Sequence, residues 1–338
     1  MVSALRQLGF DRVFDTNFTA DLTIMEEGTE LLTRLAKAVR DKQPVALPLF
    51  TSCSPGWIRY AEHFWPDILP NISTCKSPQQ MFGALAKTYF ADKIGKKAED
   101  IFVVSVMPCT AKKYECQRPE MNASGVRDVD VVLTTRELGR MIKQAGLDFA
   151  GLPDGAMDSI LGASSGAADI FANTGGVMEA ALRTAWEIVT GKQLPFENLH
   201  VTPIAGLKGI KEASVTVQGA LPEWSFLDGV TMKVAVAHGL GNARALIERI
   251  KAGEVYHFVE IMTCPGGCIG GGGQPRITTD EVRLARIAAI YKEDEGKAIR
   301  KSHRNPEVMA VYEEYLKAPL GEKSHHLLHT HYTARERV

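Results

Sequence analysis

The stretch that decides the fold runs from residue 256 to residue 275 and reads YHFVEIMTCPGGCIGGGGQP. It opens on the near-continuous apolar run Tyr256–Met262, which is typical of a β-strand covered on both faces. The loop that follows contains Cys264 and Cys268. It continues into Gly270–Gly273, where the missing side chains allow the backbone to approach a bulky group closely. We therefore expect a buried strand that ends in a cysteine loop suited to a cofactor.

Two earlier segments have the same order of apolar strand and cysteine loop. VALPLFTSCSPGW at 45–57 places Cys53 after the predicted strand Val45–Phe50. IFVVSVMPCTAKK at 101–113 places Cys109 after the predicted strand Ile101–Met107. Ligands of parallel α/β folds collect where the strands end at their carboxyl edge. We expect the three loops to converge on one buried site.

Strand-like and helix-like segments alternate along the chain, which predicts an α/β fold with a mostly parallel sheet. Further strands are expected at Val129–Thr134, Ser214–Gln218 and Met232–His238. The expected helices are Leu22–Val39, Pro55–Phe64, Pro78–Asp92, Arg136–Ala145, Val177–Thr190, Ala243–Ala252 and Pro306–Leu316. Ser77 is the expected N-cap of the third of these helices. A length of 338 residues predicts about two domains, and the Gly- and Pro-rich stretch Gly146–Asp158 is the expected end of the first.

Composition excludes several classes of protein. The 39 basic and 40 acidic residues give a net charge of −1, which argues against a strongly basic nucleic-acid-binding surface. No apolar run approaches the ~18 residues of a membrane span. The N-terminus has no charged segment followed by an apolar one, so we expect no secretory signal and a cytoplasmic location. Six cysteines are too few for a disulfide scaffold in a chain of this length.

The cysteine spacing leaves three interpretations open. Cys264 and Cys268, together with distant cysteines, have the character of thiolate ligands to an iron–sulfur cluster. Zinc is less favoured, because no histidine stands at the usual spacing near these loops. The cysteines can also be buried structural residues in turns at strand ends. The histidines near the C-terminus, which include His325 and His329, have no cysteine or carboxylate beside them in the sequence and predict no metal site.

Taken together, the three motifs TSCxPGW, MPCxxKK and CPGGCxxGGGQP resemble the signatures of the iron-only (FeFe) hydrogenases, in the same order and at compatible distances. The resemblance extends from Val13 to His325. It implies two α/β lobes, each with a small twisted, mostly parallel sheet and flanking helices, and a cofactor in the cleft between them. The implied boundaries are 1–150 for the first lobe, 151–318 for the second and 319–338 for a C-terminal segment.

The cofactor implied by the resemblance is the H-cluster, a 4Fe–4S cubane joined to a two-iron unit with carbonyl, cyanide and dithiolate ligands. Cys109, Cys264 and Cys268 match cubane ligands, and Cys268 matches the ligand that bridges to the two-iron unit. Ser54 occupies the fourth ligand position, where the family has cysteine. Weak ligation by serine, a cubane with one labile iron, ligation by Cys53 in place of its proton-transfer role, and an engineered serine all remain open.

The family's proton relay is matched at each position by Cys53, Glu27, Ser73, Glu30 and Arg34. From spacing alone, Glu27, Glu30 and Arg34 share one helix face, which is also the pattern of an ordinary solvated ion pair. Lys112 matches the residue that pairs with a cyanide ligand. The walls of the two-iron site are matched by Met107, Pro108, Gln79, Phe171 and Met262. Without the resemblance, the two methionines and the phenylalanine are typical core residues.

The function implied is reversible reduction of protons to hydrogen gas, with electrons from an external carrier such as ferredoxin. Maturation proteins are expected partners, together with either a small subunit or an upstream segment that completes the pocket. Ser54 favours an alternative, a catalytically impaired or sensory iron–sulfur homologue. A nicotinamide-linked oxidoreductase rests only on the incomplete glycine turn Gly239-x-Gly241-x-x-Arg244.

Overall fold

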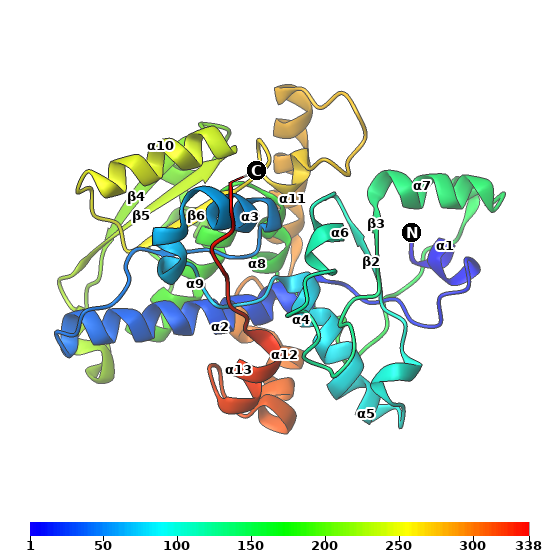
Figure 1. Ribbon diagram of the computed structural model, residues 1–338, viewed down its shortest axis with the longest axis horizontal. Helices are drawn as coiled ribbons and strands as arrows, with labels where there is room; N and C mark the ends of the chain where they lie inside the picture. Colours follow the sequence, from blue (N-terminus) through cyan, green and yellow to red (C-terminus); the bar gives the residue numbers. More distant parts are fainter. Residues whose placement is uncertain (338) are drawn as a thin grey trace.

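Two small sheets organise the computed structural model, which describes residues 1–337 (Figure 1). The larger sheet has the strand order β1-β6-β5-β4, and the smaller sheet pairs β2 with β3. The strands are β1 (Leu49–Phe50), β2 (Val104–Met107), β3 (Val131–Thr134), β4 (Ile210–Thr216), β5 (Thr231–His238) and β6 (Phe258–Met262). Only the pair of β4 and β5 is antiparallel among these strands. The predicted α/β class with mostly parallel sheets is confirmed.

Helices cover both faces of the larger sheet, as the near-continuous apolar strands predict. Leu49 and Phe258 face a core that includes α9 and α2, whereas the next residues in each strand, Phe50 and Val259, face a core with α3 and α10. Figure 1 shows α10 above this sheet and α9 and α2 below it. The helices are α1 (Val2–Gln7), α2 (Asn17–Leu35), α3 (Pro55–Phe64), α4 (Pro78–Leu85), α5 (Ala91–Lys93), α6 (Lys112–Glu115), α7 (Thr135–Gln144), α8 (Gly166–Asp169), α9 (Gly176–Thr190), α10 (Leu240–Lys251), α11 (Asp280–Gly296), α12 (Pro306–Val311) and α13 (Glu322–Leu328).

The observed helices differ from the predicted ones mainly in where they begin and end and in the π-helical turns that interrupt them. The helix expected at Leu22–Val39 begins earlier, at Asn17, and passes into a π-helical turn after Leu35. The helix expected at Pro78–Asp92 is interrupted by a π-helical turn at Ala86–Phe90. Helix α11 has no counterpart among the predictions, because Asp294 is its only buried residue and no apolar stripe marks it.

The larger sheet joins segments that are far apart in the sequence. Strand β1 comes from the region before residue 150, yet it pairs in parallel with β6. Helix α2 likewise packs against α9. A division of the chain after residue 150 would separate both pairs. The lobe boundaries at 150 and 318 stay a prediction. Val338, the last residue of the expected C-terminal segment, lies outside the described residues.

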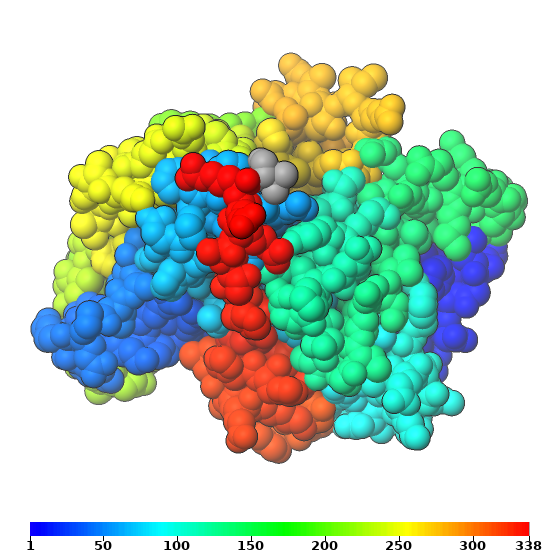
Figure 2. Space-filling model, viewed as in Figure 1, coloured from blue at the N-terminus to red at the C-terminus, as the bar shows by residue number. Residues whose placement is uncertain are grey.

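An extended segment after α13 runs along the surface between α3 and the region of α6 (Figures 1 and 2). Its anchor is Glu62 of α3, whose side chain is fully buried. The Arg118 guanidinium donates to both Glu62 oxygens, at 2.6 and 3.0 Å, and Arg335 donates at 2.9 Å. This carboxylate thus ties the end of the described chain to the helix that follows the first cysteine loop. Among residues 1–337, no helix is both long and apolar enough to span a bilayer.

Candidate functional site

The three cysteine loops meet, as their positions after β1, β2 and β6 predict. The Gly273 amide donates to the carbonyl of Pro108 at 2.9 Å, which joins the third loop to the second. The Ser54 hydroxyl lies 2.7 Å from the Thr263 hydroxyl, which joins the first loop to the third. Cys53, Cys109, Cys264 and Cys268 are all half-buried free thiols.

Burial and repulsion between neighbouring thiols together raise the pKa values of the cysteines in the third loop. Burial, with the neighbouring Cys109 and Cys264, raises the pKa of Cys268 to about 12 despite the Lys112 ammonium. Burial and Cys109 also raise the pKa of Cys264. The three thiols are therefore close enough for one ionised sulfur to disfavour another. A bound cation would reverse that effect, because thiolates are stabilised by metal ions.

Glycines let the loop backbones approach one another around these thiols. A Cβ atom at Gly273 would lie 2.7 Å from the Pro108 carbonyl carbon and 2.8 Å from the Cys109 amide nitrogen. A Cβ at Gly267, whose φ is +94°, would lie 2.7 Å from the Thr174 amide nitrogen. Three convergent thiols on such a glycine-lined scaffold fit an iron–sulfur group, since thiolate sulfur is its preferred ligand.

Adding a methyl group at Gly273 should separate the second and third cysteine loops. The Cβ of Gly273→Ala would press on backbone atoms of residues 108 and 109, which cannot rotate away. We expect a stability loss of about 1–3 kcal/mol and a lower iron content, measured by urea unfolding and iron analysis. Gly241→Ala on α10 is the control, because its Cβ meets no atom within 4 Å. Equal iron content in the two variants would contradict the proposed close approach.

Ser54 stands beside the cysteine cluster with its hydroxyl already paired. Its Oγ contacts the Thr263 hydroxyl and also accepts the Thr263 amide at 3.3 Å. Thr263 directly precedes Cys264, so the predicted fourth ligand position lies next to a predicted thiolate ligand. The hydroxyl makes no capping bond to α3, although Ser54 is the N-cap residue.

Lys112 points from α6 toward the first loop. Its ammonium donates to the Cys53 carbonyl at 3.0 Å and pairs with Glu115 at 3.0 Å. Glu115 also accepts bonds from Ser77 at 2.9 Å and Gln79 at 3.2 Å. Ser77 is the N-cap residue of α4, as predicted, but its hydroxyl donates to Glu115 and makes no capping bond.

The predicted wall residues divide between two neighbouring cores. Met262, Phe171 and Cys53 pack in the core beneath the larger sheet. Met107 ends β2 and packs in the core of the smaller sheet. Pro108 contacts the glycine loop through its backbone. The Gln79 amide oxygen accepts a bond from Ser105 of β2 at 2.9 Å.

The predicted relay residues lie close together on α2 and the adjoining loop. The Ser73 hydroxyl donates to Glu30 Oε2 at 2.8 Å, and Arg34 donates to Glu30 Oε1 at 2.7 Å. Neither carboxyl oxygen of the fully buried Glu27 has a hydrogen-bond partner among the described residues. Burial, followed by repulsion from Glu30, raises the pKa of Glu27 to about 8. Burial, followed by the Glu27 carboxylate, raises the pKa of Cys53 well above its usual value.

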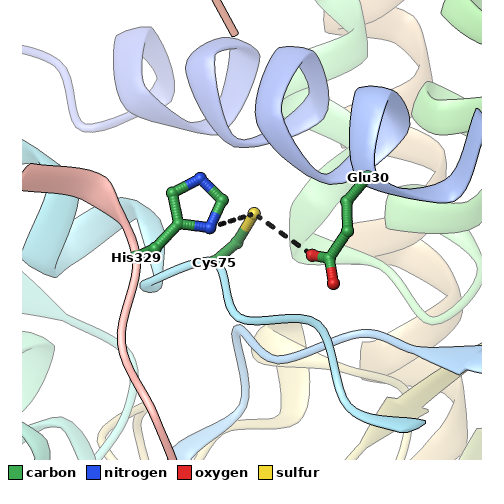
Figure 3. Close-up of side chains that lie close together, drawn as sticks. All are labelled: Glu30, Cys75 and His329. Atoms are coloured by element: carbon green, nitrogen blue, oxygen red, sulfur yellow. Dashed lines mark hydrogen bonds between the residues drawn. The ribbon is translucent and has the colours of Figure 1, made fainter. Parts of the chain in front are cut away.

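The structure also adds residues that the sequence did not single out. Cys75 stands outside the three cysteine loops and is fully buried in a hydrophobic core, where it lies between Glu30 and His329 (Figure 3). His329 comes from the C-terminal histidine cluster, directly after α13. The signal was missed because the three residues are distant in sequence and meet only through tertiary packing.

Two protein-family models match consecutive parts of the chain. Residues 1–272 match the C-terminal domain of the iron-only hydrogenase large subunit. Residues 280–335 match the iron hydrogenase small subunit. The small-subunit sequence that was expected as a possible separate partner is therefore matched within this chain.

Several bacterial hydrogenases are similar to the chain over most of its length. NADP-reducing hydrogenase subunit HndD of Solidesulfovibrio fructosivorans is 54% identical over 100% of this chain and 56% of the relative. The periplasmic iron hydrogenase large subunit of Nitratidesulfovibrio vulgaris is 53% identical over 81% of this chain and 62% of the relative. The chain thus spans less than two thirds of the length of these relatives. A cytosolic Fe–S cluster assembly factor, narfl of Xenopus tropicalis, is 32% identical over 100% of this chain and 69% of the relative.

Solved structures agree with the sequence matches. The FeFe-hydrogenase HydA(deltaEFG), in a structure titled for stepwise assembly of the H-cluster, superposes with a TM-score of 0.86 at 47% identity. That match covers 98% of this chain and 87% of the other. An apo variant of HydA1 from Chlamydomonas reinhardtii gives a TM-score of 0.87 at 46% identity, over 99% of this chain and 87% of the other. By sequence and by fold, the chain belongs to the iron-only hydrogenase family.

Proposed function

We propose that the chain catalyses the reversible reduction of protons to hydrogen gas at an H-cluster, with electrons from an external carrier such as ferredoxin. The observation that carries this proposal is the meeting of Cys109, Cys264 and Cys268 beside a buried row of proton-carrying groups. A cluster ligand set alone would suit an electron carrier. The adjoining relay residues favour a reaction that consumes or releases protons.

Three thiolates would hold the cubane. These are Cys109, Cys264 and Cys268, of which Cys268 would also bridge to the two-iron unit, and Ser54 occupies the fourth position. When bound, the H-cluster supplies the redox chemistry that combines protons with electrons. The chain's own contribution is to hold that group between Met107, Pro108, Gln79, Phe171 and Met262, and to exclude bulk water. The buried Lys112 ammonium would give a charge-assisted hydrogen bond to an anionic ligand there.

Protons would move along side chains that can each hold or pass one. The Cys53 thiol exchanges a proton with Glu27, whose raised pKa of about 8 lets the carboxyl hold or release it near neutral pH. The Ser73 hydroxyl passes the proton to Glu30, since it already donates to that carboxylate. Arg34, paired with Glu30, has 15% side-chain exposure and forms the outer end of the series.

A second candidate function is a role in iron–sulfur protein assembly or sensing without hydrogen turnover. It is favoured by the 32% identical relatives, whose names are those of cytosolic Fe–S assembly proteins, and by Ser54 in place of a fourth cysteine. The greater identity to the bacterial hydrogenases, together with the Cys53 and Glu27 pair, favours the hydrogenase function.

Partners and location belong to the same proposal. Ferredoxin or a similar carrier would supply electrons, and maturation proteins would deliver the two-iron unit. The name of one relative makes it a subunit of an NADP-reducing hydrogenase, and the name of another places it in the periplasm. We propose a cytoplasmic location for this chain, which fractionation of the source cells would test.

Infrared spectroscopy on protein matured without oxygen tests the proposal. Carbonyl and cyanide bands are expected, with hydrogen evolution from reduced ferredoxin on the same sample. Bands without turnover would instead support the sensing or assembly function. An absence of bands, while a hydrogenase relative matures normally in parallel, would overturn the proposed cofactor.

A further inference from the structure

A thiol, an imidazole and a carboxylate from three distant segments meet beside the relay. Cys75 Sγ lies 4.0 Å from Glu30 Oε2 and 4.0 Å from His329 Nδ1. One ligand atom from each of the three residues lies within 4.8 Å of the other two. All three residues are buried, and Figure 3 shows the sulfur between the ring and the carboxylate. These are three of the donor types that zinc prefers in proteins.

A second carboxylate fixes the orientation of the imidazole. Glu26 Oε2 lies 3.0 Å from His329 Nε2 and accepts the Leu320 amide at 2.8 Å. Ser324 and Tyr312 also donate to Glu26. Glu26 thus holds the ring through Nε2, while Nδ1 lies 2.8 Å from the Thr74 hydroxyl and 4.0 Å from Cys75 Sγ. Histidine ligands in metal sites are characteristically held in this way by a carboxylate.

The surrounding charges favour a cation at this point. Two carboxylates lie against this group: Glu30 Oε2 is 4.0 Å from Cys75 Sγ, and Glu26 Oε2 is 3.0 Å from His329 Nε2. Arg34 is bound through the other oxygen of Glu30, Oε1, at 2.7 Å. Glu30 Oε2, which faces the thiol, accepts bonds from Ser73 and Thr74 but none from Arg34. A bond to a metal ion would replace these two hydrogen bonds.

We propose that Cys75, His329 and Glu30 form a zinc-binding site that is separate from the three cysteine loops. Binding forms bonds from Zn²⁺ to Sγ, Nδ1 and Oε2, and the thiol proton is released to solvent. With bonds of about 2.3 Å to sulfur and 2.0 Å to nitrogen and oxygen, a tetrahedral ion holds its donors about 3.5 Å apart. The two distances from Sγ, now 4.0 Å, need to shorten by about 0.5 Å, and the imidazole and carboxylate atoms, which lie within 4.8 Å of each other, by up to about 1.3 Å. Water or the Thr74 hydroxyl completes the four ligands.

Occupation of this site would inhibit proton transfer. A metal bond at Glu30 Oε2 displaces the hydrogen bond from Ser73, which is the step between Glu27 and Glu30 in the relay. This consequence rests on the proposed function, whereas the binding of zinc does not.

The test titrates Zn²⁺ into the cluster-loaded protein. We expect one tightly bound zinc per chain, with X-ray absorption at the zinc edge giving one sulfur and otherwise nitrogen or oxygen neighbours. Cys75→Ala should weaken binding more than about tenfold, the lower limit seen even for loss of a residue that only orients a ligand. Cys116→Ala is the matched control, because Cys116 is also a buried thiol but donates to the Lys113 carbonyl.

Two outcomes would overturn the zinc site: no binding, or binding that Cys75→Ala leaves unchanged. If Cys75→Ala fails to fold, His329→Gln serves in its place, because the amide can still hydrogen bond to Glu26. Unchanged infrared bands during the titration establish that zinc has not displaced the H-cluster. Zinc bound through Cys75 without any fall in hydrogen evolution would support the site and overturn the relay role of Glu30.

Discussion

Replacing Glu27 with glutamine should lower hydrogen evolution by about 10²–10⁴-fold, the usual contribution of a positioned proton-transfer group. The amide keeps the shape of the side chain but can neither release nor accept a proton near neutral pH. Both oxygens of Glu27 lack a close hydrogen-bond partner among the described residues, and only weak contacts with the Ser73 hydroxyl and the Ser52 amide act on the carboxyl, so the substitution disturbs few contacts of the fold. Turnover should be measured per cofactor, with infrared bands as the measure of loading.

Glu27→Asp is the matched comparison for this experiment. It keeps a titratable carboxyl one methylene further from Cys53, and we expect intermediate turnover. If Glu27→Gln retained full turnover with normal infrared bands, the proton route through Glu27 would be wrong. If both variants lost turnover equally, packing rather than proton exchange would be the cause.

The same glutamine variant should change the pH dependence of stability. The wild-type carboxyl has a pKa of about 8 in the folded chain and an ordinary value of 4.5 when exposed, with burial as the main cause. Between these values the folded state binds more protons, so wild-type stability falls as pH rises. The stability of Glu27→Gln relative to wild type should therefore increase from about pH 5 to pH 8, as urea unfolding would measure.

Changing Ser54 to cysteine should produce the second large effect, a gain in cluster retention. A thiolate is a better matched ligand for iron in a sulfur cluster than a hydroxyl, whose proton is hard to remove. The Ser54 hydroxyl lies 2.7 Å from that of Thr263, the residue before Cys264, so we expect the new sulfur to fall near the ligand set. We expect Ser54→Cys to hold four irons in the cubane and to lose them several-fold more slowly to a chelator.

Ser54→Ala separates the hypotheses for the native serine. If the hydroxyl ligates iron, alanine should lose the cluster faster than wild type. If the hydroxyl serves only to bond Thr263, iron retention should be equal in the two proteins, with a small loss of stability. Ser54→Cys protein that retains its cluster no better than wild type would contradict the assignment of this position as the fourth ligand.

The strands and the cysteine loops were predictable because their signals are local. An apolar run followed by cysteine, as in Tyr256–Met262 and Cys264, needs no information from elsewhere in the chain. The α7 helix likewise carries its own capping box, with Thr134 and Glu137 bonded reciprocally. Helix α11 begins with its own cap at Thr279, but its apolar residues form no buried stripe, and so the periodicity that predicted the other helices did not single it out.

Side-chain partners were much less predictable than backbone elements. The i,i+3 and i,i+4 spacing predicted that Glu30 and Arg34 share a face, and the structure places them 2.7 Å apart. Nothing in the spacing indicates that Ser77 serves Glu115, or that Glu26 orients His329. The first pair joins the start of α4 to α6 over 38 positions, and the second joins α2 to a residue 303 positions away. The roles of the individual site residues stay predictions until variants are measured.

The pairing of the first cysteine loop with the third has a consequence for biosynthesis. Ser54 and Thr263 are 209 positions apart, and ribosomes add roughly 5–20 residues per second. The thiol of the first loop therefore exists for about ten seconds or more on a nascent chain that lacks the third loop. Loop closure over such a distance is also slow in itself. A cofactor that binds all three loops can accordingly be completed only after Cys268 has been made, and until then the earlier thiols are open to stray metals and oxidants.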